Sequence, residues 1–190
     1  MSEIGFAVTG SFCTFDRALE QMKILSAAGH NVTPIMSYHA YNLDTKFGKA
    51  ADFIAQMEEA CQHKMIHTIQ QAEPVGPKKM FDILIIEPCS GNTLAKLAAG
   101  IVDTPVLMAA KSHLRNARPL LLAVSTNDAL GNSAKNIGFL MNQKNIYFIP
   151  LGQDDIYHKP RSIVADFKLT EAAMHAALNG MQLQPMIKSY

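Results

Sequence analysis

The sequence predicts an α/β domain in which helices cover both faces of a doubly wound, mostly parallel sheet, giving three layers. Residues 82–86 and 119–124 are apolar without polar alternation, which is typical of strands buried on both faces. Between such strands, apolar residues recur at helical spacing, as at Leu19, Met22 and Leu25. Strands that alternate with helices in this way form parallel sheets through right-handed crossovers.

The first half of the chain supports this order of elements. Residues 4–8 form the first predicted strand, and a helix starts at Phe15. A second strand is expected at 31–36, although Pro34 inside it cannot donate a hydrogen bond to a sheet. One long amphipathic helix is predicted over 49–71, because apolar residues recur there every four positions, at Phe53, Met57, Cys61, Met65 and Ile69.

The second half continues the alternation. After the strand at 82–86, a polar turn leads into a helix from Leu94. Thr104-Pro105 provides a cap and a first-turn proline for a helix over 104–115. The remaining elements that we expect after the strand at 119–124 are a helix at 133–142, a strand at 145–149 and a terminal helix at 170–179.

The bulk properties indicate one domain, spanning residues 1–190, that binds a small molecule. A chain of 190 residues with 48% hydrophobic content is suited to a single core. A formal net charge of +1 gives no basic surface for nucleic acid or for an anionic membrane. Three cysteines without a Cys-x-x-Cys pair suggest a reducing compartment, and no export signal or spanning segment is recognised. A cytoplasmic protein is therefore expected.

Three polar turns, at residues 9–14, 87–93 and 124–128, are predicted to lie at the carboxyl edge of the sheet, where such sheets bind ligands. The first has a glycine and hydroxyls before a helix, which suits a phosphate, although an ordinary capped turn has the same pattern. In the second, small polar residues could face the edge of a heterocycle. Alternatively, Ser90 or Asn92 could simply cap the helix that follows.

Further candidates are less specific. Asn127, which follows a strand, suits a substrate carboxylate or a cofactor carbonyl, and the alternative is a turn-forming asparagine. His63 and His67 stand four apart in the predicted long helix without a third ligand, so no metal site is predicted. A basic cluster suits a dicarboxylate and is expected to share a substrate site with Asn127, although solvated helix ends often have the same composition. Its members are Lys111, His113, Arg115 and Arg118.

Residues 88–103 strongly resemble the homo-oligomeric flavin-containing decarboxylase superfamily, which includes phosphopantothenoylcysteine decarboxylases and flavin prenyltransferases. The resemblance extends to Thr9-Gly10-Ser11, to Ser37 with Ala40, to Arg118-Pro119 and to Asn127. It implies a Rossmann-like or flavodoxin-like flavoprotein fold, an FMN cofactor, and a homo-oligomer, a trimer or a multiple of it, with the site at a boundary between copies. By position, the implied FMN-binding residues are Gly10, Ser11, Ser37, Ser90, Asn92 and Thr93.

Two departures from this superfamily argue against decarboxylation of a peptidyl cysteine. Pro74 stands where the cysteine decarboxylases have a histidine, eight residues before Asp82. Val124-Ser125-Thr126 replaces the Pro-Ala-Met that precedes their asparagine.

A closer resemblance, to the B subunits of dipicolinate synthases from spore-forming bacteria, covers nearly the whole chain and includes residues 72–82, 109–116, 125–128 and 144–148. It implies an oxidoreductase subunit that acts with an A subunit during sporulation, in the cytoplasm of the mother cell. The pair oxidises a dihydrodipicolinate-type precursor to dipicolinate (pyridine-2,6-dicarboxylate). NAD(P) is expected on the A subunit, because this chain has no Gly-x-Gly-x-x-Gly turn. The alternatives are an FMN-dependent decarboxylase or flavin prenyltransferase, and a non-catalytic partner that stabilises or regulates the A subunit.

Overall fold

The computed structural model describes residues 1–188 and contains one twisted sheet. Its parallel part has the order β2-β1-β3-β4-β5, so the chain reverses its direction of winding after β2. A short antiparallel pair, β6 and β7, joins the sheet through the carboxyl end of β4. The strands are β1 Glu3–Val8, β2 Asn31–Met36, β3 Ile83–Cys89, β4 Leu120–Thr126, β5 Ile146–Phe148, β6 Leu151–Gly152 and β7 Ile163–Ala165.

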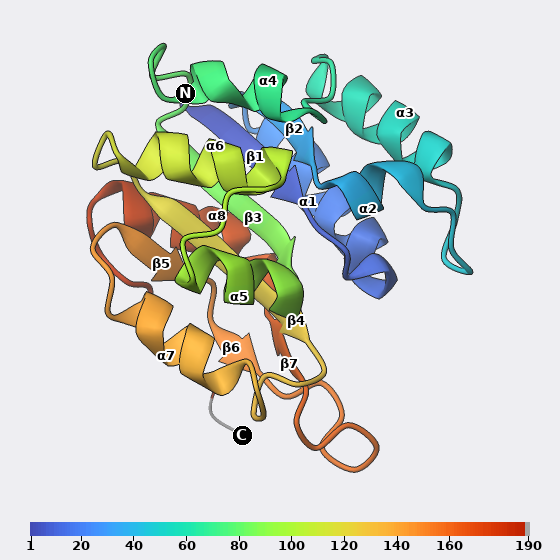
Figure 1. The fold of residues 1–190 in the computed structure, drawn as a ribbon, viewed down its shortest axis with the longest axis vertical. Helices are drawn as coiled ribbons and strands as arrows, with labels where there is room; N and C mark the ends of the chain where they lie inside the picture. The colour runs from blue at the N-terminus through green and yellow to red at the C-terminus, as the bar shows by residue number, and fades with distance from the viewer. Residues whose placement is uncertain (189–190) are drawn as a thin grey trace.

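Helices cover both faces of the sheet (Figure 1). Helices α5 and α6 lie on one face, and α1 and α8 lie on the other. All seven residues of the central strand β3 are buried, as expected between two helical layers. The predicted three-layer, doubly wound fold is confirmed. The helices are α1 Phe15–Ala27, α2 Tyr38–Asn42, α3 Ala50–Cys61, α4 Ile69–Ala72, α5 Gly91–Ala98, α6 Pro105–Leu114, α7 Ala134–Met141 and α8 Thr170–Leu178, with short 3₁₀ turns η1 Phe12–Thr14, η2 Glu73–Val75 and η3 Phe167–Leu169.

The prediction of one helix over 49–71 is wrong. Helix α3 ends at Cys61, and Gln62 has a left-handed backbone with φ of 56°. Beyond it, Ile66 pairs with the edge strand β2: its N–H donates to the oxygen of Pro34 at 2.9 Å, and its own oxygen accepts from Met36 at 2.8 Å. Met65 continues the period of four although it lies outside the helix. It is buried beside Ile66, where the chain extends the edge of the sheet.

The same contacts explain how a proline fits into β2. Strand β2 lies at the edge of the sheet, beyond β1. The carbonyl of Pro34 points outward to Ile66, so its nitrogen, which has no hydrogen, also faces away from β1. Edge strands tolerate proline in this orientation, and the predicted strand at 31–36 is confirmed.

Two further boundaries differ from the prediction. Strand β3 continues through Cys89, and helix α5 begins at Gly91 rather than at Leu94. The pair β6 and β7 was not predicted, because two or three residues are too few for a readable alternation. Within residues 1–188, the structure contains no helix that is both long and apolar enough to cross a membrane.

Candidate functional site

A cavity of about 530 Å³ opens at the carboxyl ends of β1, β2 and β3. The turns that follow these three strands form its walls, together with the start of α6. Five of the six residues predicted to bind a cofactor line it. The lining consists of Gly10, Phe12, Ser37, Tyr38, His39, Leu43, Ser90, Asn92, Thr93, Lys96, Asp103, Thr104 and Leu107.

Hydrogen bonds between the turns fix the shape of this cavity. The buried hydroxyl of Thr9 donates to the oxygen of Pro88 at 2.8 Å and accepts from the N–H of Ser90 at 3.0 Å. The hydroxyl of Ser11, the sixth predicted residue, donates to the oxygen of Ser125 at 2.6 Å and does not line the cavity. Thr9 and Ser11 therefore position the turns. The role of Thr9 was not predicted, because its partners lie far away in the sequence.

Three helices begin at the wall of the cavity. Each has a hydroxyl residue as its N-cap: Ser37 accepts from Ala40, Ser90 from Thr93 and Thr104 from Leu107. Capping was the alternative considered for Ser90, and it is confirmed. Uncapped N–H groups in the first turn of a helix attract anions, so the caps and a ligand phosphate are compatible here.

Asn92 differs from these capping residues. Its side chain is exposed and makes no hydrogen bond to any residue between 1 and 188. It lines both the cavity and a second, more polar pocket of about 460 Å³, so the two are neighbours. The other residues of this polar pocket are Gly91, Ala95, Thr126, Asn127, Asp128, Asn132, Ser133, Lys135 and Asn136.

Asn127 projects from a loop that Asp128 holds in place. One carboxylate oxygen of Asp128 accepts from Thr126 at 2.6 Å and from Ser133 at 2.8 Å, and these bonds lower the pKa of Asp128. The side chain of Asn127 is exposed and is bonded to no residue in the described part of the chain. Its amide is thus free to meet a ligand. Asn127 is also the first residue of the turn that follows β4, so its backbone has the alternative role considered for it.

The predicted basic cluster lies elsewhere. Lys111, His113 and Arg115 belong to the end of α6, and Arg118 precedes β4, so all four lie at the amino end of this strand and Asn127 lies at its carboxyl end. The predicted grouping of these residues with Asn127 in one substrate site is therefore corrected. The physical reason is that residues before a parallel strand and residues after it lie at opposite edges of the sheet.

Two members of the basic cluster have structural contacts. His113 is buried and its Nε2 lies 2.9 Å from the oxygen of Pro119; burial lowers the pKa of His113 to about 4. Arg118 donates to the backbone oxygen of Phe81 and lies 3.5 Å from the carboxylate of Asp82. These contacts hold the segment before β4 to the end of α6 and to the start of β3.

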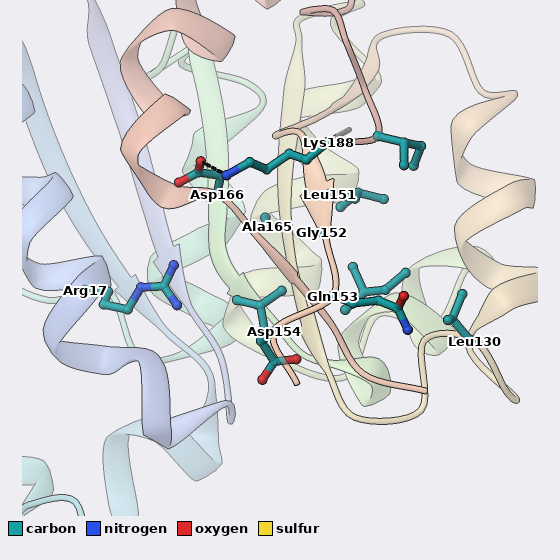
Figure 2. Close-up of a pocket in the computed structure, with 12 residues that line it drawn as sticks. Arg17, Leu130, Leu151, Gly152, Gln153, Asp154, Ala165, Asp166 and Lys188 are labelled. Carbon is teal, nitrogen blue, oxygen red and sulfur yellow. Dashed lines mark hydrogen bonds and ion pairs between the residues drawn. The ribbon is translucent and has the colours of Figure 1, made fainter. Parts of the chain in front are cut away.

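A third cavity, of about 460 Å³, is lined in part by the β6 and β7 pair (Figure 2). Arg17 extends toward it from α1, and the ion pair between Lys188 and Asp166, at 2.7 Å, lies at its edge. Its remaining lining is largely apolar, with Leu151 and Ala165 among the residues drawn. The lining contains none of the predicted site residues.

Comparison with known proteins identifies the family. The family model described as Flavoprotein matches residues 1–177. The chain belongs to the flavoprotein family. This flavoprotein is 43% identical over 184 residues to the dipicolinate synthase B subunit from Bacillus subtilis (strain 168), and the match covers 97% of the chain and 92% of that protein. The predicted resemblance is confirmed.

Solved structures agree with the sequence comparison. The crystal structure of the dipicolinate synthase B subunit from Bacillus halodurans C matches this flavoprotein with a TM-score of 0.91 and 41% identity, covering 99% of this chain and 96% of that one. The FMN-dependent cysteine decarboxylase SpaF matches with a TM-score of 0.68 and 19% identity, covering 93% and 95%. At that identity the second match shows a common fold alone.

Proposed function

We propose that this flavoprotein is the B subunit of a dipicolinate synthase. In this proposal it binds FMN and acts with a nicotinamide-binding A subunit to oxidise a dihydrodipicolinate-type precursor to dipicolinate. The observation that carries the proposal is that a chain similar over nearly its whole length to dipicolinate synthase B subunits has a cavity lined by most of the expected flavin contacts.

The cavity fits a flavin nucleotide in size and chemistry. Its volume lies within the range of about 300–1,000 Å³ that is usual for small-molecule sites. Phe12, Leu43 and Leu107 offer apolar surface for a ring system. The backbone at Gly10 and the capped start of α2 at Ser37 offer N–H groups for a phosphate. When bound, the flavin would supply a hydride acceptor.

The polar pocket beside the cavity is the proposed place of the substrate. Asn127 and Asn92 offer amide donors that have no partner among residues 1–188. Lys135, in the same pocket, supplies an ammonium group for one carboxylate. The carboxylate of Asp128 already accepts hydrogen bonds from Thr126 and Ser133 in its own loop. In this proposal these side chains bind and orient a cyclic dicarboxylate, while aromatisation of the ring favours loss of a hydride and a proton.

Ser37→Asp tests the FMN site. Aspartate caps a helix as well as serine does, so α2 should be retained, while the added carboxylate repels a phosphate. We expect FMN binding to be lost, as measured by quenching of flavin fluorescence during titration with the protein. Thr68→Asp is the matched control, because Thr68 caps α4 in the same way and does not line the cavity.

The outcomes separate the alternatives. Unchanged FMN affinity in Ser37→Asp would refute the assigned phosphate position. Absence of FMN binding in the parent chain and in both variants would favour the non-catalytic partner over the flavoenzyme.

A further inference from the structure

Two histidines and a glutamate meet outside the cavities described above. His30 immediately precedes β2, and Glu171 and His175 belong to α8. A ligand atom from each residue lies within 4.8 Å of those from the other two. Because Glu171 and His175 are four positions apart in a helix, their side chains share one face. The imidazole rings of His30 and His175 have centroids 6.0 Å apart and are tilted by 55°, so they are not stacked on each other.

This set of donor atoms is suited to zinc. Two imidazole nitrogens and one carboxylate oxygen bind Zn²⁺ in proteins, and a solvent molecule then occupies the fourth tetrahedral position. Calcium and magnesium prefer oxygen ligands alone. His30 and Glu171 are partly buried and His175 is exposed, so an ion can enter from solvent.

We propose that His30, Glu171 and His175 bind a zinc ion that ties helix α8 to the turn between α1 and β2. The site is at the amino end of β2, whereas the flavin cavity lies at the carboxyl ends of the strands. Zinc here acts on the stability of the fold and takes no part in the redox chemistry. An ion that binds the folded chain and not the unfolded chain raises the melting temperature of the protein.

Zinc would also replace the hydrogen bond that holds the imidazole ring of His30. The backbone N–H of Ser2 donates to Nδ1 of His30 at 3.2 Å. A zinc ion on Nδ1 displaces this bond directly. A zinc ion on Nε2 moves the ring proton to Nδ1, which then cannot accept a hydrogen bond from the N–H of Ser2. In either case the metal replaces Ser2 as the partner of the ring.

The test is a titration of the full chain, prepared without a polyhistidine tag and freed of metal with a chelator, with ZnCl₂. Isothermal calorimetry should show one ion per chain, and the melting temperature should rise with zinc. His175→Ala and Glu171→Gln should each weaken binding by at least about tenfold, since each removes a ligand. His158→Ala is the control, because His158 is exposed and contacts Asp155.

Circular dichroism in the absence of metal checks that the variants fold; His175 is exposed, so its truncation should leave the fold intact. Parent-like zinc affinity and an unchanged thermal shift in both His175→Ala and Glu171→Gln would overturn the proposal. Loss of binding in His158→Ala alone would place the ion elsewhere.

Discussion

Glu87 is a carboxyl group that the fold buries completely. Its Oε2 accepts from the hydroxyl of Thr170 at 2.7 Å, while Oε1 has no partner among residues 1–188. Burial raises the pKa of Glu87 well above its usual range, and the bond from Thr170 and the charge of Arg17 oppose this only in part. A carboxyl group with a raised pKa in the folded state favours folding at low pH, and its contribution becomes unfavourable as pH rises above the pKa of the unfolded chain.

Glu87→Gln should therefore stabilise the protein by an amount that grows with pH. Above about pH 4.5, removal of this carboxyl is expected to add up to about 1.4 kcal/mol per pH unit until the folded-state pKa is reached. Thermal melts of parent and variant at pH 5, 6, 7 and 8 measure the difference. Glu20→Gln, which removes an exposed carboxyl from α1, controls for the change in net charge. A difference in melting temperature that is the same at all four pH values would contradict the inference.

At the scale of elements, the start of α5 lies very close to the end of β4. A Cβ atom on Gly91 would be 2.8 Å from Oγ1 of Thr126 and 3.0 Å from Oδ1 of Asp128. These atoms belong to the hydrogen bonds that hold the Asn127 loop. The absence of a side chain at Gly91 therefore lets the turn after β3 and the turn after β4 meet.

Gly91→Ala should destabilise the protein by about 1–3 kcal/mol, because the added methyl group displaces this network. For a chain of this size, that corresponds to roughly 2–4 °C in melting temperature per kcal/mol. Gly138→Ala is the matched control, since Gly138 lies in α7 with no atom within 4 Å of an added Cβ. There we expect a gain of about 0.5–1 kcal/mol. Equal changes in melting temperature for the two substitutions would show that the turns at Gly91 have room for a side chain.

Most elements could be predicted because local patterns determine them. Helix α6 has a capping threonine and a first-turn proline, and β3 is an apolar run, so both were found. Residues 49–71 were mistaken for one helix because burial alone does not distinguish a helix from an added edge strand. What separates them is the pairing of Ile66 with β2, a contact between segments that the sequence does not reveal.

At the scale of the whole molecule, the same limit applies to the site. Three turns could be expected to meet, because the carboxyl ends of parallel strands share one edge. The direction of the Ser11 side chain depends on Ser125, which is 114 positions away, so it could not be predicted. The three proposed zinc ligands could not be predicted for a similar reason, since only the fold brings His30 next to α8.

Formation of dipicolinate is expected to need both this chain and the proposed A subunit. Alone, the chain should make little or no dipicolinate, because its flavin can accept only one hydride and the nicotinamide that would reoxidise this flavin is expected on the A subunit. Formation of dipicolinate should become catalytic when this partner is added. Asn127→Ala should lower the rate of the pair by about tenfold to a hundredfold, the loss expected for one hydrogen bond to a charged group. Since Asn127 is exposed and bonded to no residue between 1 and 188, the fold should be unaffected.

Lys111→Ala is the matched control for this last experiment, because Lys111 is exposed at the amino end of β4, away from Asn127. It should leave the rate unchanged. Co-elution of the two proteins on size-exclusion chromatography, for both variants, would show that the complex still forms. The shared site fails if the partner by itself reaches the full rate, or if the pair with Asn127→Ala is as fast as the parent pair. In that event the chain stabilises or regulates its partner, and the polar pocket beside the cavity has no part in binding the dicarboxylate.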